Sequence, residues 1–214
     1  MKIKISVLFF GLTFLFNDSF GQKKSDSTII RKCLKELKSL RSLSNINLFD
    51  SIKPDKSFTY WEVNANYGGN FKNYYRSNKQ TFNDTTLSIK SNSGFGTICP
   101  PDGCFWYIST TMLGQSKTIE NISSLSNFIG TIDNIYDAYL WLSAQNLTDS
   151  KRIPISTNPS IKYKLLDKGY LISMSDLMIS DCPVTYGTLI YFVAFDKTII
   201  HIKTIKTEIT RGCI

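Results

Sequence analysis

The order in which helical and strand patterns follow one another restricts the fold of this chain most strongly. Apolar residues recur at spacings of three and four over residues 25–43 and again over residues 123–145, which predicts two helices. Runs rich in β-branched and aromatic residues, typical of strands, lie between and after these stretches. Strands and helices do not alternate one by one, so a parallel sheet is not indicated. We therefore predict a single α+β domain with a largely antiparallel sheet, an N-terminal helix and a central helix.

Glycines indicate where these elements turn or stop. Gly68 and Gly69 predict a tight hairpin within residues 64–83, because two consecutive glycines accept the backbone angles of a two-residue turn. Gly130 interrupts the second helical pattern, and Asp133 is the expected cap of the helical piece that follows. Further strands are predicted at residues 58–63, 87–90, 104–112, 161–166, 170–175, 184–195 and 199–210.

The first residues have the pattern of a secretory signal peptide. Lys2 and Lys4 precede an apolar run over residues 5–16, and small residues follow at Ser19 and Gly21. We predict that residues 1–21 are a signal peptide and that residues 22–214 form a secreted or periplasmic domain. No later segment reaches the roughly 20 uninterrupted apolar residues that a membrane helix needs, so we expect no membrane span.

Positive charge is concentrated early in the chain. The net charge is +8, and residues 22–57 contain nine Lys or Arg against four Asp or Glu. A basic region favours anionic partners such as lipopolysaccharide, polyanionic glycans or a membrane surface, although a solvated helix face explains the same charges. The chain has no nucleic-acid-binding motif, so we expect no nucleic-acid partner.

The predicted exported part contains five cysteines, and an oxidising compartment favours disulfides over metal sites. Cys99 and Cys104 enclose residues 100–103, a Pro-Pro-Asp-Gly sequence that favours a turn, so we predict a bridge between them. Cys33 lies on the apolar stripe of the first predicted helix. We expect Cys33 to stay reduced and buried.

The second predicted bridge joins Cys182 to Cys213 and depends on the register of a C-terminal hairpin. If Asp196 pairs with Ile199, paired positions sum to 395, and the two cysteine numbers also sum to 395. A bulge would spoil this register, and the apolar pattern shifts along the second strand. A rival connectivity links the 99–104 loop to one of these two cysteines.

Few residues suit catalysis. His201 is the only histidine, and the chain lacks a Gly-x-Ser-x-Gly elbow, a Cys-x-x-Cys motif and a His-x-x-x-His pair. We therefore expect an ordinary strand position for His201, and no catalytic residue, metal site or cofactor. A mechanism that needs only carboxylates stays open, but spacing selects no pair, and Asp133 and Asp137 are explained by helix capping and solvent exposure. The candidate carboxylates are Glu62, Asp102, Glu120, Asp133, Asp137 and Asp176.

Residues 60–82 alternate aromatic rings with amides around the glycine pair. Rings stack on the apolar faces of sugars and amides bind sugar hydroxyls, so this region is the candidate ligand site. The alternative is that the rings belong to the core or to cross-strand pairs of a sheet, where aromatic residues are common. The candidate ligand-binding residues are Trp61, Tyr67, Tyr74, Tyr75 and Trp106.

These observations favour an exported, disulfide-containing, non-catalytic binding or interaction module with a glycan or protein partner at the cell envelope. Two alternatives stay open: a small secreted hydrolase that uses carboxylates, and a secreted inhibitor or immunity protein. A surface rich in exposed rings would support binding, whereas a deep pocket with two carboxylates of raised pKa would support the hydrolase.

Overall fold

The computed structural model describes residues 26–43, 48–55, 57–77, 89–96, 104–112, 115–145, 161–179 and 184–209. The chain separates into two compact units, residues 1–39 and residues 40–214. The predicted signal peptide lies outside the described residues. Within the described ranges, no helix has the length and apolar character needed to cross a bilayer.

The described part of the first unit is helical. Residues 26–36 form an α-helix that continues into the 3-10 helix η1 (Leu37–Ser39), where the Ser39 hydroxyl donates to the Glu36 carbonyl oxygen at 2.8 Å. Cys33 is fully buried and free of any disulfide, as predicted, and burial raises the pKa of its thiol to about 11. The predicted N-terminal helix is thus confirmed.

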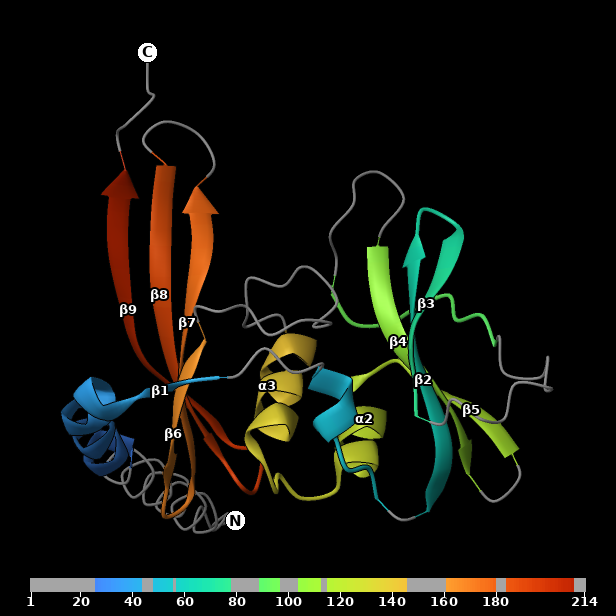
Figure 1. Ribbon diagram of the computed structural model, residues 1–214, viewed down its shortest axis with the longest axis horizontal. Coiled ribbons are helices and arrows are strands. Elements are labelled where there is room, and N and C mark those ends of the chain that lie inside the picture. The colour runs from blue at the N-terminus through green and yellow to red at the C-terminus, as the bar shows by residue number, and fades with distance from the viewer. Residues whose placement is uncertain are drawn as a thin grey trace, which may run out of the picture. The chain divides into compact units, whose positions relative to one another are not determined.

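The second unit contains two antiparallel sheets (Figure 1). The predicted α+β class with antiparallel strands is confirmed, but the sequence did not indicate that the strands divide between two sheets. The four-stranded sheet has the order β3-β2-β4-β5, made of β2 (Phe58–Tyr67), β3 (Asn70–Arg76), β4 (Cys104–Met112) and β5 (Gln115–Ile119). The five-stranded sheet has the order β1-β6-β7-β8-β9, made of β1 (Arg41–Ser42), β6 (Lys162–Leu166), β7 (Gly169–Ile179), β8 (Val184–Ala194) and β9 (Ile199–Ile209).

The predicted central helix is divided at Gly130 into α2 (Ile122–Ile129) and α3 (Ile135–Ala144). Gly130 has a φ of +65°, a backbone angle that glycine adopts without strain, which confirms the predicted break. The predicted cap Asp133 is wrong, because Asn134 caps α3 by accepting from the backbone N–H groups of Tyr136 and Asp137. The Asp133 carboxylate instead accepts from the Thr131 hydroxyl at 2.8 Å.

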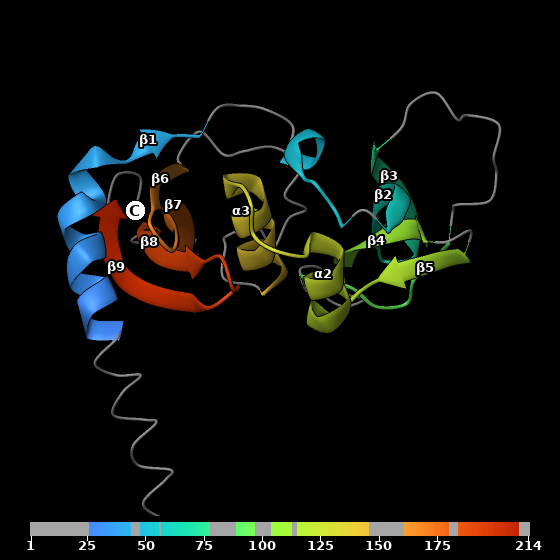
Figure 2. The same cartoon turned by 90° about the horizontal axis from the view of Figure 1, so that it is seen from below.

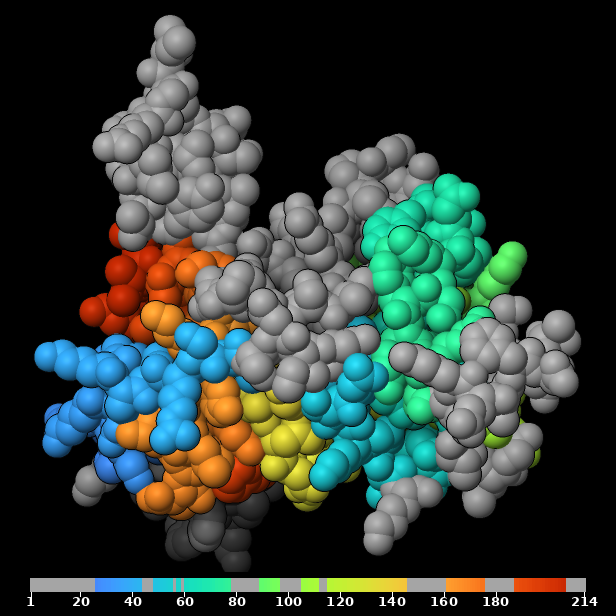
Figure 3. Space-filling view, in the orientation of Figure 1, coloured from blue at the N-terminus to red at the C-terminus, as the bar shows by residue number. Residues whose placement is uncertain are grey.

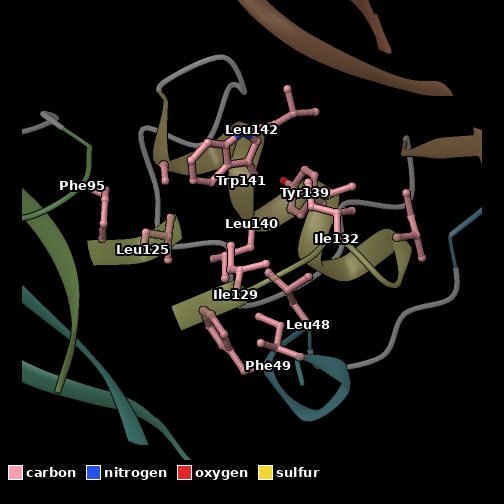
Figure 4. Packing of buried hydrophobic residues seen from close by; sticks show 14 of the residues in the cluster. Leu48, Phe49, Phe95, Leu125, Ile129, Ile132, Tyr139, Leu140, Trp141 and Leu142 are labelled. Atoms are coloured by element: carbon pink, nitrogen blue, oxygen red, sulfur yellow. The ribbon is translucent and has the colours of Figure 1, made fainter. Parts of the chain in front are cut away.

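Helices α2 and α3 lie between the two sheets in both views (Figures 1 and 2). On the four-stranded side, the ring of Phe128 in α2 contacts Trp61 of β2 at a centroid distance of 5.4 Å. On the five-stranded side, the indole N–H of Trp141 in α3 donates to the carbonyl oxygen of Lys197 at 3.0 Å. One apolar core runs through this unit, and side chains of η2 (Leu48–Ser51) lie beside those of α2 and α3 in it (Figure 4).

The register predicted for the last hairpin is wrong. Val193 pairs with Ile199, so paired positions near the turn sum to 392, and beyond a bulge, where Ile190 pairs with Lys203, they sum to 393. The hairpin turns through a three-residue loop at residues 195–197, whose last residue, Lys197, has a φ of +73°, and not through a two-residue turn at residues 197–198. The register argument for a bridge between Cys182 and Cys213 therefore falls away. Both cysteines lie outside the described residues, and their pairing stays a prediction.

Candidate ligand surface

The two faces of the four-stranded sheet differ in chemistry. Side chains alternate along β2, so that Trp61, Val63 and Ala65 lie on one face and Glu62 and Asn64 on the other. The first set belongs to the apolar core shared with the helices. We call this the helix face, and we call the opposite side the polar face.

Two of the five candidate ligand residues are part of a ring cluster at the open end of the β2–β3 hairpin. Trp61, only 4% exposed, has Tyr75 at a ring-centroid distance of 4.6 Å and Phe49 of η2 at 6.2 Å. The Tyr75 hydroxyl donates to Asp50, and burial, together with that carboxylate, raises the pKa of Tyr75 to about 12. These contacts make Trp61 a core residue and hold Tyr75 half-buried between Trp61 and Phe49, so neither ring is proposed as a ligand contact.

Trp106 is also internal. It pairs with Ala65 on the helix face and is 1% exposed. Phe95 forms an isolated backbone bridge with Trp106, and the two rings lie 4.6 Å apart between centroids. Trp106 therefore joins residues 89–96 to β4 and is not available to a ligand in this structure.

Of the other two candidates, Tyr67 lies at the closed end of the hairpin, and Tyr74, the residue before Tyr75, reaches Tyr67 with its side chain. The predicted turn is confirmed: Tyr67 pairs with Asn70, and Gly68 and Gly69 between them have φ angles of +56° and +88°. The Gly69 N–H donates to the Asn66 side-chain oxygen at 2.7 Å, which holds the turn in place. The hairpin forms part of the face of the molecule seen in Figure 3.

An irregularity in β3 brings the two tyrosines together. Asn64 pairs with Asn73, but the next pair is Val63 with Tyr75, so Tyr74 is an extra residue. The Tyr74 hydroxyl donates to the Tyr67 hydroxyl at 2.8 Å, and the two rings meet edge to face at a centroid distance of 6.3 Å. Burial and this hydrogen bond raise the pKa of Tyr67 to about 12, although its side chain is 37% exposed.

Two lysines accompany rings at this end of the hairpin, one on each face. Lys72 places its ammonium 4.9 Å from the centroid of Tyr74, and Lys90 places its ammonium 5.0 Å from the centroid of Phe71. Neither lysine was among the residues predicted from the sequence to bind a ligand. The signal was the alternation of Phe71, Lys72 and Tyr74, in which a cation stands between rings. We define the tip surface as Tyr67, Lys72 and Tyr74.

The polar face contains a buried polar layer instead of an apolar core. Glu62 is 5% exposed, forms an ion pair with Arg76 at 3.1 Å and accepts from the Tyr60 hydroxyl at 2.7 Å. Asn64 donates to the Ser109 hydroxyl at 3.0 Å and accepts from Asn73 at 2.9 Å. The ion pair and these hydrogen bonds lower the cost of burying the polar side chains.

Residues 89–91 cross this polar layer. The Ser109 hydroxyl donates to the Ile89 carbonyl oxygen at 3.3 Å, and the Ser91 hydroxyl donates to the Glu120 carboxylate. The carboxylates of Glu62 and Glu120 thus belong to one polar region, a relation that sequence spacing did not reveal. Both are engaged by neighbouring side chains in this structure. Asp102 and the side chain of Asp176, two other candidate carboxylates, fall outside the described part of the chain.

The prediction that Asp137 is exposed to solvent is wrong, because its side chain is fully buried. Its carboxylate accepts from the Asn134 amide at 2.7 Å and from the Asp133 backbone N–H at 3.3 Å. Burial raises the pKa of Asp137 to about 7, with a smaller contribution from the charge of Asp133. The reason is the packing of the first turn of α3 against η2, where Asn134 also donates to the Ser51 carbonyl oxygen at 3.4 Å.

His201 occupies an exposed position on β9, as predicted for an ordinary strand residue. Its Nε2 atom lies 2.8 Å from the Thr204 hydroxyl, and its ring lies 5.2 Å from that of Tyr191. Among the described residues, no group of three or more His, Cys, Asp or Glu is arranged to hold a metal ion.

Comparison with known proteins adds no relative: no protein-family model matches the chain, and neither a curated protein nor a solved structure is significantly similar to it.

Proposed function

We propose that this protein is a non-catalytic binding protein that recognises glycans through the tip surface. The observation that carries this proposal is the pair Tyr67 and Tyr74: two rings held at a fixed angle by a hydrogen bond, at a hairpin end where Tyr67 is 37% exposed. A tyrosine ring offers an apolar face for the C–H groups of a sugar and a hydroxyl for its oxygens.

Preorganisation supports this assignment. The Tyr74 hydroxyl fixes the Tyr67 ring before any ligand arrives, so little side-chain freedom remains to be lost on binding. Tyr67 is not part of the apolar core, whereas Trp61 is one of its members, and Tyr74 is half-buried against that core. Rings that are ordered but not required for packing are suited to contact with a partner.

The proposal includes export. The N-terminal pattern of residues 1–21 supports a signal peptide, and secretion or transfer to the periplasm would bring the tip surface to envelope or extracellular glycans. The predicted bridges, Cys99 with Cys104 and Cys182 with Cys213, suit that oxidising location.

The decisive experiment substitutes Tyr67→Ala in the exported chain and measures binding to a glycan array, with affinities by calorimetry. We expect affinity to fall at least about tenfold, the effect of losing a central aromatic contact. The matched control is Leu165→Ala, which removes another exposed apolar side chain from β6 of the other sheet and should leave affinity unchanged. Unaltered binding by the Tyr67 variant, or binding only to proteins of envelope extracts, would contradict the proposal.

A further inference from the structure

The tip surface carries positive charge that no described carboxylate balances. Lys72 is exposed, and among the described residues no Asp or Glu lies within ion-pair distance of its ammonium. Residues 63–83 contain lysine and arginine but neither Asp nor Glu. Arg76, farther along β3, is by contrast paired with Glu62. The charge near the turn is thus available to a partner, whereas the charge at the base is used within the fold.

Contact with the Tyr74 ring fixes the position of the Lys72 ammonium. Lys72 pairs with Ala65, so its side chain rises from the helix face, the same face as Tyr67, and its ammonium lies 4.9 Å from the Tyr74 ring centroid. An ammonium over an aromatic face is held by electrostatic attraction yet keeps donors free for another acceptor. A ligand on Tyr67 would therefore meet a cation beside its ring.

The opposite face repeats the arrangement. Phe71 pairs with Asn66, and the Lys90 ammonium lies 5.0 Å from the Phe71 ring centroid. Among the described residues, Lys90 also has no carboxylate within ion-pair distance. Both faces of the hairpin end thus combine a ring with an ammonium, which favours a ligand that carries negative charge at regular intervals.

We propose that the ligand of the tip surface is an acidic polysaccharide, whose sugar ring stacks on Tyr67 while a carboxylate of the same chain binds the Lys72 ammonium. This inference rests on the proposed glycan-binding function and narrows it to uronate-containing chains. Hydrogen bonds between an ammonium and a carboxylate are about twice as strong as neutral ones, so the charge adds discrimination against neutral glycans. Polysaccharides also present many equivalent sites, and repeated weak contacts add up.

The test compares polygalacturonate with its fully methyl-esterified form, which has the same sugar rings without the charge. Calorimetry on the exported chain should show binding to polygalacturonate at least about tenfold tighter than to the ester, as expected for loss of a charge-assisted contact. Raising the salt concentration from 50 to 300 mM should weaken only the charged ligand, because exposed charges are screened. Alginate and chondroitin sulfate extend the test to other uronate chains.

Three variants separate a local site from general charge attraction. Lys72→Met keeps the stem and removes the charge, so affinity for polygalacturonate should fall about fivefold to tenfold. Lys72→Arg keeps the charge and should remain within about threefold of the unmodified protein. Lys117→Met changes the net charge by the same amount at an exposed position on β5 and should change affinity by less than about twofold.

The outcomes distinguish the two proposals. Equal binding of polygalacturonate and its ester, with loss of both in the Tyr67→Ala variant, would leave glycan binding intact and overturn the acidic specificity. Equal loss in the Lys72→Met and Lys117→Met variants would reduce the effect to net charge and also overturn it. Failure of the unmodified protein to bind any of these polysaccharides would overturn the acidic specificity, and an empty glycan array in the same preparation would overturn glycan binding as well.

Discussion

The two ends of the β2–β3 hairpin contain the same kinds of residue on the same face of one sheet, yet they differ in role. At the open end, Trp61 and Tyr75 are covered by Phe49 and Phe128 from η2 and α2. At the closed end, Tyr67 is 37% exposed, and the ring beside it belongs to Tyr74 of its own hairpin. An aromatic side chain becomes core or surface according to whether another element reaches it, and not according to its strand.

The largest expected difference between the two ends appears when one ring is removed from each end of the hairpin. Trp61→Ala should lower the free energy of unfolding by about 3 to 5 kcal/mol, because a buried indole leaves both lost contacts and a cavity. Tyr67→Ala should lower it by less than about 1 kcal/mol, since its ring contributes little to the core. Urea unfolding of both variants gives the two values. Similar losses at the two positions would show that the closed end is also core.

The next prediction concerns pH, which should change the stability contributed by the buried Asp137 but not ligand binding at the tip surface. The pKa of Asp137 is raised to about 7 in the folded protein, above the ordinary value of about 3.9, so the folded state binds this proton more tightly. Its contribution to stability is complete below about pH 4 and is lost as pH rises toward 7, at about 1.4 kcal/mol for each unit between the two pKa values.

Asp137→Asn should remove this part of the pH dependence, because a neutral amide oxygen still accepts hydrogen bonds in the same place. Urea unfolding of both proteins at pH 4, 5.5 and 7 gives the difference, which should grow with pH in favour of the variant. Ligand binding at the tip surface should not change over this pH range, since the pKa of Tyr67 is about 12. A constant difference across the three pH values would mean that Asp137 is ionised throughout.

The smallest effect compares two hydroxyl groups. Tyr74→Phe removes the hydrogen bond to Tyr67 and should weaken ligand binding about twofold to threefold, with a stability change below about 1 kcal/mol. Tyr60→Phe removes the hydrogen bond to Glu62 in the buried polar layer and should lower stability by about 1 kcal/mol without changing affinity. Thermal unfolding and calorimetry on both variants sharpen the comparison. The reverse pattern would assign the ligand site to the polar face.

Local features of the fold could be predicted because they depend on neighbouring residues alone. The turn at Gly68 and Gly69 follows from backbone freedom, and the helix break follows from Gly130. The cap of α3 was assigned one residue too early, because Asp and Asn are about equally good caps and spacing could not choose between Asp133 and Asn134.

The loop between β8 and β9 contacts residues that are distant in the sequence. Lys197 holds the left-handed backbone angle of the loop while its ammonium donates to the carbonyl and hydroxyl oxygens of Ser126 in α2, both at 2.8 Å. The Trp141 indole of α3 donates to the carbonyl oxygen of the same lysine. A two-residue loop was the simpler interpretation of the hairpin sequence, and these contacts with α2 and α3 add to the local hydrogen bonds that hold the three-residue loop.

For the candidate site, the sequence by itself determined the supply of rings, amides and positive charge between Tyr60 and Phe82, together with the turn that presents them. Only the tertiary structure decided which rings are exposed, because burial depends on elements distant in the chain: η2 and α2 cover Trp61, and residues 89–96 cover Trp106. It also decided that an extra residue in β3 turns Tyr74 toward Tyr67. Residue types and turns are properties of short segments, whereas exposure and register are properties of the surfaces that those segments meet.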